Sequence, residues 1–71
     1  MITYYKLLDM LNRRNMTREQ LKNKSGIGSA TMTKISKGES VTLKTINEIC
    51  EVLQCQPGDI LEWQPDEKTK N

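Results

Sequence analysis

Apolar side chains recur with helical spacing at two places along this sequence. Over residues 3–15 they form one stripe at positions i, i+3, i+4 and i+7, comprising Tyr4, Leu7, Leu8 and Leu11. A second stripe follows the cap residue Thr42 and comprises Leu43, Ile46, Ile49, Cys50 and Leu53. This period is that of an amphipathic helix with one buried face. We therefore predict two helices that pack through these stripes into one core.

The segment after the first stripe carries the start and stop signals of a short helix. Thr17 is a favourable N-cap, and Gln20, three residues later, completes a capping box. Gly26 supplies the left-handed residue that commonly ends a helix. These signals predict a helix over residues 18–24.

Another short helix is predicted over residues 29–37, between Gly28 and Gly38. Met32 and Ile35, three residues apart, would form its inward face. Its outward face would carry small polar and basic side chains where a buried helix has apolar ones, namely Ser29, Ala30, Thr33, Lys34 and Lys37. Two helices joined by a glycine turn, the second with a polar outer face, have the outline of a helix-turn-helix.

The C-terminal part of the sequence predicts a fifth, short helix. Pro57 suits the first position of a helix and Asp59 its first turn, while Ile60 and Leu61 would bury it. Trp63 is interpreted as a lid over the first helix or, alternatively, as a contact between two copies of the chain.

The 71 residues suffice for one small domain. We assign residues 1–64 to an all-α domain, a compact five-helix bundle, and predict that residues 65–71 form a disordered charged tail.

Charge is unevenly distributed along the chain, although the net charge is only +2. Residues 13–44 carry eight cations and two anions, a net charge of +6, whereas residues 45–71 carry two cations and six anions, a net charge of −4. A basic surface over the predicted helix pair is typical of a protein that binds a polyanion. The alternative interpretation is a solvated surface whose asymmetry arose by chance.

Several classes of function are not expected from this composition. Cys50 and Cys55 would close only a trivial loop, so we interpret them as core thiols of a reduced, cytoplasmic protein. With no His and only two Cys, neither a metal site nor a cofactor is expected. No secretory or membrane-spanning segment is recognisable. An enzyme is not expected either, because there is no paired-acid cleft and little volume for a pocket.

Five segments in register resemble the Cro/CI-type, phage-repressor-like family of helix-turn-helix domains, in its small stand-alone bacterial form. These segments are T-R-E-Q-L, S-G-I-G, T-M-T-K-I-S-K-G, T-L-K-T-I-N-E-I-C-E-V-L-Q-C and P-G-D-I-L, and the resemblance covers about residues 4–63. The resemblance implies a lambda-repressor-like fold. Lys22 departs from the family pattern, which usually has a small Ala there; its stem could lie along the surface with its charge in water.

The resemblance implies that the helix over residues 29–37 lies in the major groove of double-stranded DNA. By position, the candidates for base contacts are Ser29, Ala30, Thr31, Thr33 and Lys34. Candidates for phosphate contacts are Thr17 and Arg18 at a helix N-terminus, followed by Lys37 and Lys44. For Arg13 and Arg14, phosphate contacts are no better an explanation than charges in water at the end of the first helix.

These features predict a sequence-specific DNA-binding transcriptional regulator, in particular a repressor. The alternative is an antitoxin or another protein-interaction module on the same fold. A weak homodimer through Ile60, Leu61 and Trp63 is also expected, because one such helix covers only a short half-site.

Overall fold

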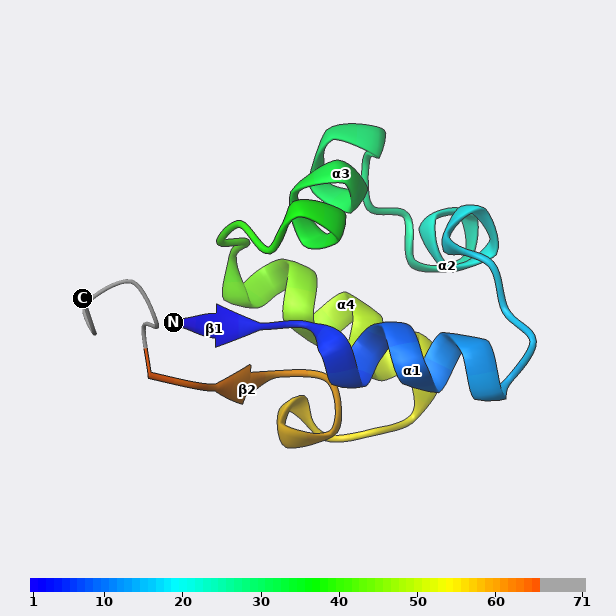
Figure 1. Cartoon of the computed structure of the whole chain (residues 1–71). Coiled ribbons are helices and arrows are strands. Elements are labelled where there is room, and N and C mark those ends of the chain that lie inside the picture. Colours follow the sequence, from blue (N-terminus) through cyan, green and yellow to red (C-terminus); the bar gives the residue numbers. More distant parts are fainter. Residues whose placement is uncertain (66–71) are drawn as a thin grey trace.

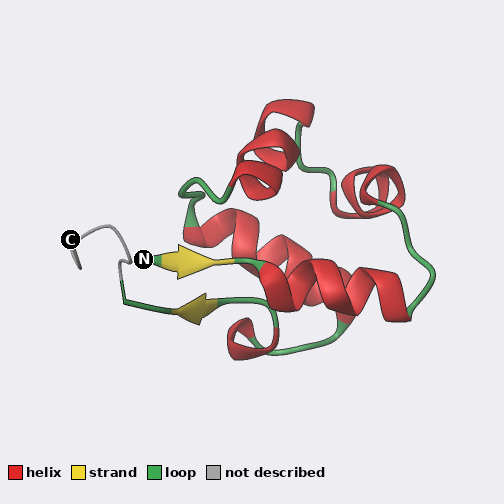
Figure 2. Ribbon diagram, viewed as in Figure 1, coloured by secondary structure: helices red, strands yellow, loops and turns green. Residues whose placement is uncertain are grey.

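Four α-helices account for most of the chain in the computed structural model, which describes residues 1–65 (Figure 1). They are α1 (Tyr5–Arg13), α2 (Arg18–Ser25), α3 (Ser29–Lys37) and α4 (Leu43–Leu53). A single 3-10 turn, η1 (Pro57–Asp59), and two short strands, β1 (Ile2–Thr3) and β2 (Glu62–Trp63), complete the described part (Figure 2). The predicted small helical domain is confirmed, and the predicted tail lies from residue 66 onward outside the described residues.

The predicted fifth helix is replaced by η1, so the described residues contain four α-helices rather than five. The amides of Ile60 and Leu61 both donate to the carbonyl of Pro57, at 3.0 and 2.9 Å, which closes a single turn. The chain then extends into β2, whose pairing with β1 is incompatible with a continuing helix. Pro57 does occupy the first position of the turn, as predicted.

The termini of the middle helices follow from their cap residues. Thr42 caps α4 by accepting a hydrogen bond from the amide of Thr45 at 3.3 Å. Gly26 and Gly38 both adopt the left-handed conformation, with φ of 78°, and end α2 and α3. A helix needs such signals at both ends because its terminal amides and carbonyls have no partners within the helix.

The helices share one apolar core. Its buried members come from every helix, from the residue before α1, from the α2–α3 turn and from the segment after η1. They are Tyr4, Leu7, Leu11, Leu21, Ile27, Met32, Ile35, Ile46, Ile49, Leu53 and Ile60. Burying a Leu or Ile side chain fully contributes roughly 1.5–3 kcal/mol, so these contacts supply the main driving force for folding. Helix α2 packs on α4, and α3 follows α2 across the glycine turn.

Leu43 was wrongly predicted to lie in the core. It is 82% exposed at the first position of α4. At 100° per residue it lies at the edge of the stripe formed by Ile46, Ile49 and Leu53. Val41 in the preceding loop packs against the core instead.

A two-stranded antiparallel sheet, which the sequence analysis missed, joins the two ends of the described chain. Ile2 pairs with Trp63 and Thr3 with Glu62. Because β1 takes up Ile2 and Thr3, α1 begins at Tyr5 rather than at residue 3. Trp63 is 66% exposed, so its interpretation as a lid over α1 is wrong. The sheet lies at the end of the molecule away from α2 (Figure 1).

Candidate nucleic-acid interface

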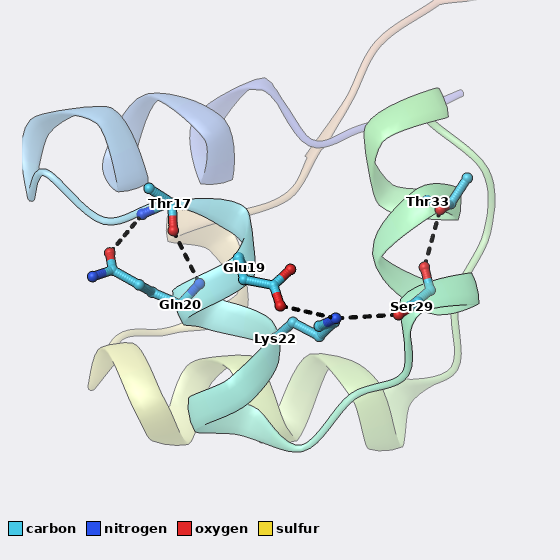
Figure 3. A network of polar contacts seen from close by, with 6 residues as sticks. All are labelled: Thr17, Glu19, Gln20, Lys22, Ser29 and Thr33. Atoms are coloured by element: carbon cyan, nitrogen blue, oxygen red, sulfur yellow. Dashed lines mark hydrogen bonds and ion pairs between the residues drawn. The ribbon is translucent and has the colours of Figure 1, made fainter.

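The N-terminus of α2 is fixed by the predicted capping box. The hydroxyl of Thr17 accepts from the amide of Gln20 at 3.0 Å, and the amide of Thr17 donates to Oε1 of Gln20 at 2.8 Å (Figure 3). The side chain of Thr17 therefore caps α2. Arg18, the first residue of the helix, is exposed beside it.

The turn between α2 and α3 sets the position of the second helix. The amide of Gly26 donates to the carbonyl of Lys22 at 3.0 Å, and Ile27 is buried directly after it. Gly28 occupies the N-cap of α3 and has no side chain to accept a hydrogen bond from the first amides. Tertiary packing through Ile27 therefore holds the start of α3 in place of a side-chain cap.

Helix α3 is anchored by one face and presents the other to solvent. Met32 and Ile35 are buried, with 7% and 1% of their surface exposed. The candidate base-contacting side chains Ser29, Ala30, Thr33 and Lys34 are all exposed, as is Lys37. Thr31 is half-buried. The geometry of a helix with 3.6 residues per turn places this polar set opposite the anchor.

Two shallow hollows beside α3 contain six of the nine candidate residues. The hollow on the α2 side brings Arg18 and Lys37 together with Ser29 and Thr33. The hollow on the α4 side brings Thr31 and Lys34 beside the loop and cap residues Ser40, Val41, Thr42 and Thr45.

Ala30, Thr17 and Lys44 line neither of these hollows. Lys44 is exposed at the second residue of α4.

A polar network links the two helices of the motif (Figure 3). Nζ of Lys22 on α2 donates to the hydroxyl of Ser29 on α3 at 3.2 Å and lies 3.3 Å from Oε2 of Glu19. The hydroxyl of Thr33 donates to the main-chain carbonyl of Ser29 at 3.0 Å. Lys22 is unusual for the family at its position, but it was not predicted to be a site residue, because its contact with Ser29 depends on how α2 and α3 pack.

The structure gives Arg13 and Arg14 partners within the protein. Nε of Arg13 lies 3.0 Å from Oδ2 of Asp9, one turn earlier on α1. Nη1 of Arg14 donates to the carbonyl of Leu53 at 2.9 Å, which ties the end of α1 to the end of α4. These contacts support the interpretation of both residues as charges at the end of α1.

The two thiols lie together at the end of α4 and are both half-buried and unbridged. Burial raises the pKa of the Cys55 thiol, and the neighbouring Cys50 raises it further.

Among residues 1–65, the acidic, Cys and His side chains form no group of three or more able to hold a metal ion. Within the same part of the chain, no helix has the length and apolar composition needed to cross a membrane.

Comparison with known proteins decides the family. A family model of the Cro/C1-type HTH DNA-binding domain matches residues 6–66. The chain belongs to this family.

Two similar proteins agree with that assignment. The chain is 42% identical over 62 residues to YozG of Bacillus subtilis (strain 168), described as an uncharacterized HTH-type transcriptional regulator, and the match covers 84% of this chain and 74% of YozG. The crystal structure of the transcriptional regulator VanUg matches with a TM-score of 0.88 at 37% identity, covering 92% of this chain and 87% of VanUg. This Cro/C1-type protein is a DNA-binding transcriptional regulator, as the sequence analysis predicted.

Proposed function

We propose that this Cro/C1-type regulator acts as a repressor that places α3 in the major groove of its operator. The observation that carries this proposal is the exposed face of α3, on which small polar and basic side chains stand opposite the buried Met32 and Ile35. A helix held in this way can enter the groove without unpacking the core. Occupying a promoter in the cytoplasm would then exclude the transcription machinery.

Different contacts are proposed for the two sides of α3. Lys34 donates to guanine N7 and O6, while the methyl groups of Ala30 and the threonines meet thymine methyls. Ser29, Thr31 and Thr33 add hydroxyl contacts to base edges. Phosphate contacts come from Thr17 and Arg18 at the start of α2, from Lys37 at the end of α3 and from Lys44 on α4.

We also propose a weak homodimer that forms at the β1–β2 end of the molecule. Met1, Ile2 and Trp63 are 54%, 45% and 66% exposed there, so three large apolar side chains face solvent at this end of the molecule. Leu61 is half-buried beside them. Ile60, which the sequence analysis also assigned to this contact, is wholly buried in the core and is removed from the proposed surface.

The test of the repressor proposal compares Lys34→Ala with Arg18→Ala on duplex DNA selected in vitro for binding. Lys34→Ala should relax the preference at one base position by about 1–3 kcal/mol, because it removes a base contact. Arg18→Ala should weaken binding to all sequences alike and reduce the dependence of log K on log salt by about one unit, because it removes a phosphate contact. Fluorescence anisotropy at several salt concentrations measures both effects.

Two outcomes would contradict the proposal. DNA affinity that does not change with salt concentration, or no DNA binding even at low salt, would show that the proposed phosphate contacts do not form. An even loss of affinity across all sequences in both variants would show that α3 does not lie in the groove as proposed.

A further inference from the structure

Lys22 crosses from α2 to the first residue of α3. Its side chain is only 23% exposed, so its apolar stem is largely covered while its ammonium group reaches two partners. Nζ donates to the Ser29 hydroxyl at 3.2 Å and pairs with the Glu19 carboxylate at 3.3 Å (Figure 3). The Glu19 carboxylate thereby holds the ammonium group next to Ser29.

The contact from Lys22 decides what the Ser29 hydroxyl can offer to DNA. A serine hydroxyl has one hydrogen to donate and two lone pairs with which to accept. One lone pair receives the hydrogen bond from the Lys22 ammonium, which draws electron density from the oxygen and strengthens its O–H as a donor. Within residues 1–65 the hydroxyl hydrogen of Ser29 has no acceptor of its own, so it is available at the exposed end of α3.

Thr33 provides an internal comparison on the same face. Its hydroxyl hydrogen is directed to the main-chain carbonyl of Ser29 at 3.0 Å. Thr33 therefore faces solvent with lone pairs and a methyl group but without a free hydroxyl hydrogen. Ser29 faces solvent with a free hydroxyl hydrogen and one remaining lone pair, which is a weaker acceptor because the oxygen already accepts from a cation. Of these two similar side chains one turn apart, only Ser29 has a hydroxyl hydrogen left to donate.

We infer that Lys22 is a positioning residue for DNA recognition, which orients Ser29 to donate to a base-edge acceptor in the major groove. The acceptors of that groove are purine N7, guanine O6 and thymine O4, while the amino groups of cytosine and adenine are donors that an oriented Ser29 disfavours. This inference rests on the proposed docking of α3 in the groove. Lys22 acts through Ser29 and need not touch the DNA itself.

The experiment measures base preference for the intact chain and for Lys22→Met, Ser29→Ala and the double variant. Methionine keeps an unbranched stem of similar length but removes the ammonium group. Lys22→Met and Ser29→Ala should each lower discrimination at the same base pair by about fivefold or more. The double variant should lose no more base discrimination than Ser29→Ala alone, because Lys22 affects discrimination only through Ser29.

Three controls separate this effect from a loss of charge or of folding. Lys24→Met removes an exposed cation from the same helix and should leave the base preference unchanged, whatever it does to affinity. Lys22→Arg keeps a donor at this position and should keep the preference. Thermal unfolding of Lys22→Met should match that of the parent chain, since the stem remains packed.

The inference fails if Lys22→Met lowers affinity evenly across sequences or if its effect adds to that of Ser29→Ala. It also fails if loss of preference accompanies loss of folding in Lys22→Met and Lys22→Arg does not restore it. Lys34→Ala distinguishes this failure from failure of the proposed function. If Lys34→Ala relaxes one base position while Lys22→Met relaxes none, α3 lies in the groove and only the role of Lys22 is wrong.

Discussion

At the scale of single residues, Cys55 links the structure to a measurable dependence on pH. Burial raises the pKa of its thiol above the ordinary value of 9.0, and the nearby Cys50 and Asp59 act in the same direction. The folded state thus favours the protonated thiol more strongly than the unfolded chain does. Below pH 9 the thiol is protonated in both states, and the contribution to stability is fully present.

We expect the free energy of unfolding to fall as pH rises above 9, because the unfolded chain then releases the Cys55 proton first. Cys55→Ala should flatten this decline. Tyr4, whose pKa burial raises from 10.0, adds a second decline above pH 10 that Tyr4→Phe should remove. Urea unfolding under reducing conditions between pH 7.5 and 11 measures these changes. A steeper decline in Cys55→Ala than in the parent chain would contradict the assignment.

The residue scale is also where prediction from sequence fails most often. Leu43 belongs to the apolar stripe by spacing, yet it is exposed, because whether another segment covers the edge of a helix depends on the tertiary arrangement. The contact of Lys22 with Ser29 could not be predicted for the same reason, since it requires the position of α3 relative to α2. Ile60 is apolar and close to Trp63 in sequence, yet the two have opposite exposure.

At the scale of elements, the left-handed backbone of the turn between α2 and α3 has a free-energy cost that can be measured separately from side-chain contacts. Gly26 has φ of 78°, and a Cβ added there would meet nothing within 4 Å. Any effect of Gly26→Ala on stability therefore comes from the backbone conformation. We expect a loss of about 1–2 kcal/mol, the usual cost of a left-handed conformation for a residue with a Cβ.

Gly58→Ala is the matched control for this turn. Its added Cβ would also meet nothing within 4 Å, but its φ lies outside the left-handed region. Its stability should stay within about 0.5 kcal/mol of the parent. Thermal unfolding compares the two variants directly, since about 1 kcal/mol shifts the melting temperature of so small a domain by about 4–8 °C. Equal losses of stability in Gly26→Ala and Gly58→Ala would show that the left-handed backbone at Gly26 is not the cause of the loss.

Elements with local signals could be predicted from the sequence, and those with distant partners could not. The bounds of α3 agree with the prediction and those of α2 differ by one residue, because caps and glycines within a few positions determine them. The strands β1 and β2 have no such signal, since each exists only by pairing with a segment at the other end of the chain. That pairing also explains the late start of α1 and the absence of a fifth helix from residues 1–65.

At the scale of the whole molecule, the proposed dimer makes a prediction about cooperativity. Two copies of α3 would lie about 34–36 Å apart to reach successive major grooves. Trp63→Ala should reduce cooperativity on DNA with two half-sites more than it reduces binding to one half-site, because Trp63 is exposed at the proposed contact. Titration of both DNAs by gel shift measures the difference.

Arg18→Ala supplies the control for the dimer. It should weaken binding to a single half-site and leave cooperativity intact, since Arg18 lies on the α2 side of α3 rather than on the sheet. Sedimentation that shows a monomer both free and on the selected DNA, with an unrepeated site, would refute the dimer.

For the candidate interface, the sequence was enough to predict which side chains lie on the exposed face of α3. Periodicity placed Met32 and Ile35 inward, and the structure agrees. Whether the exposed residues contact bases or phosphates stays a prediction. The division of Ser29 and Thr31 between two hollows depends on α2 and α4, whose positions no local pattern encodes.

The pairing of β1 with β2 also bears on the order in which the chain folds. The ammonium group of Met1 donates to the carbonyl of Gln64, a contact between residues 63 positions apart. Closing so long a loop costs more entropy than forming a neighbouring turn. A sheet with two residues per strand makes few contacts, so it contributes little free energy to offset that cost. Among residues 1–65, we therefore expect the sheet to close late during folding and to open early. Because the proposed dimer contact lies on this sheet, we expect assembly on DNA to slow hydrogen exchange at the amides of β1 and β2.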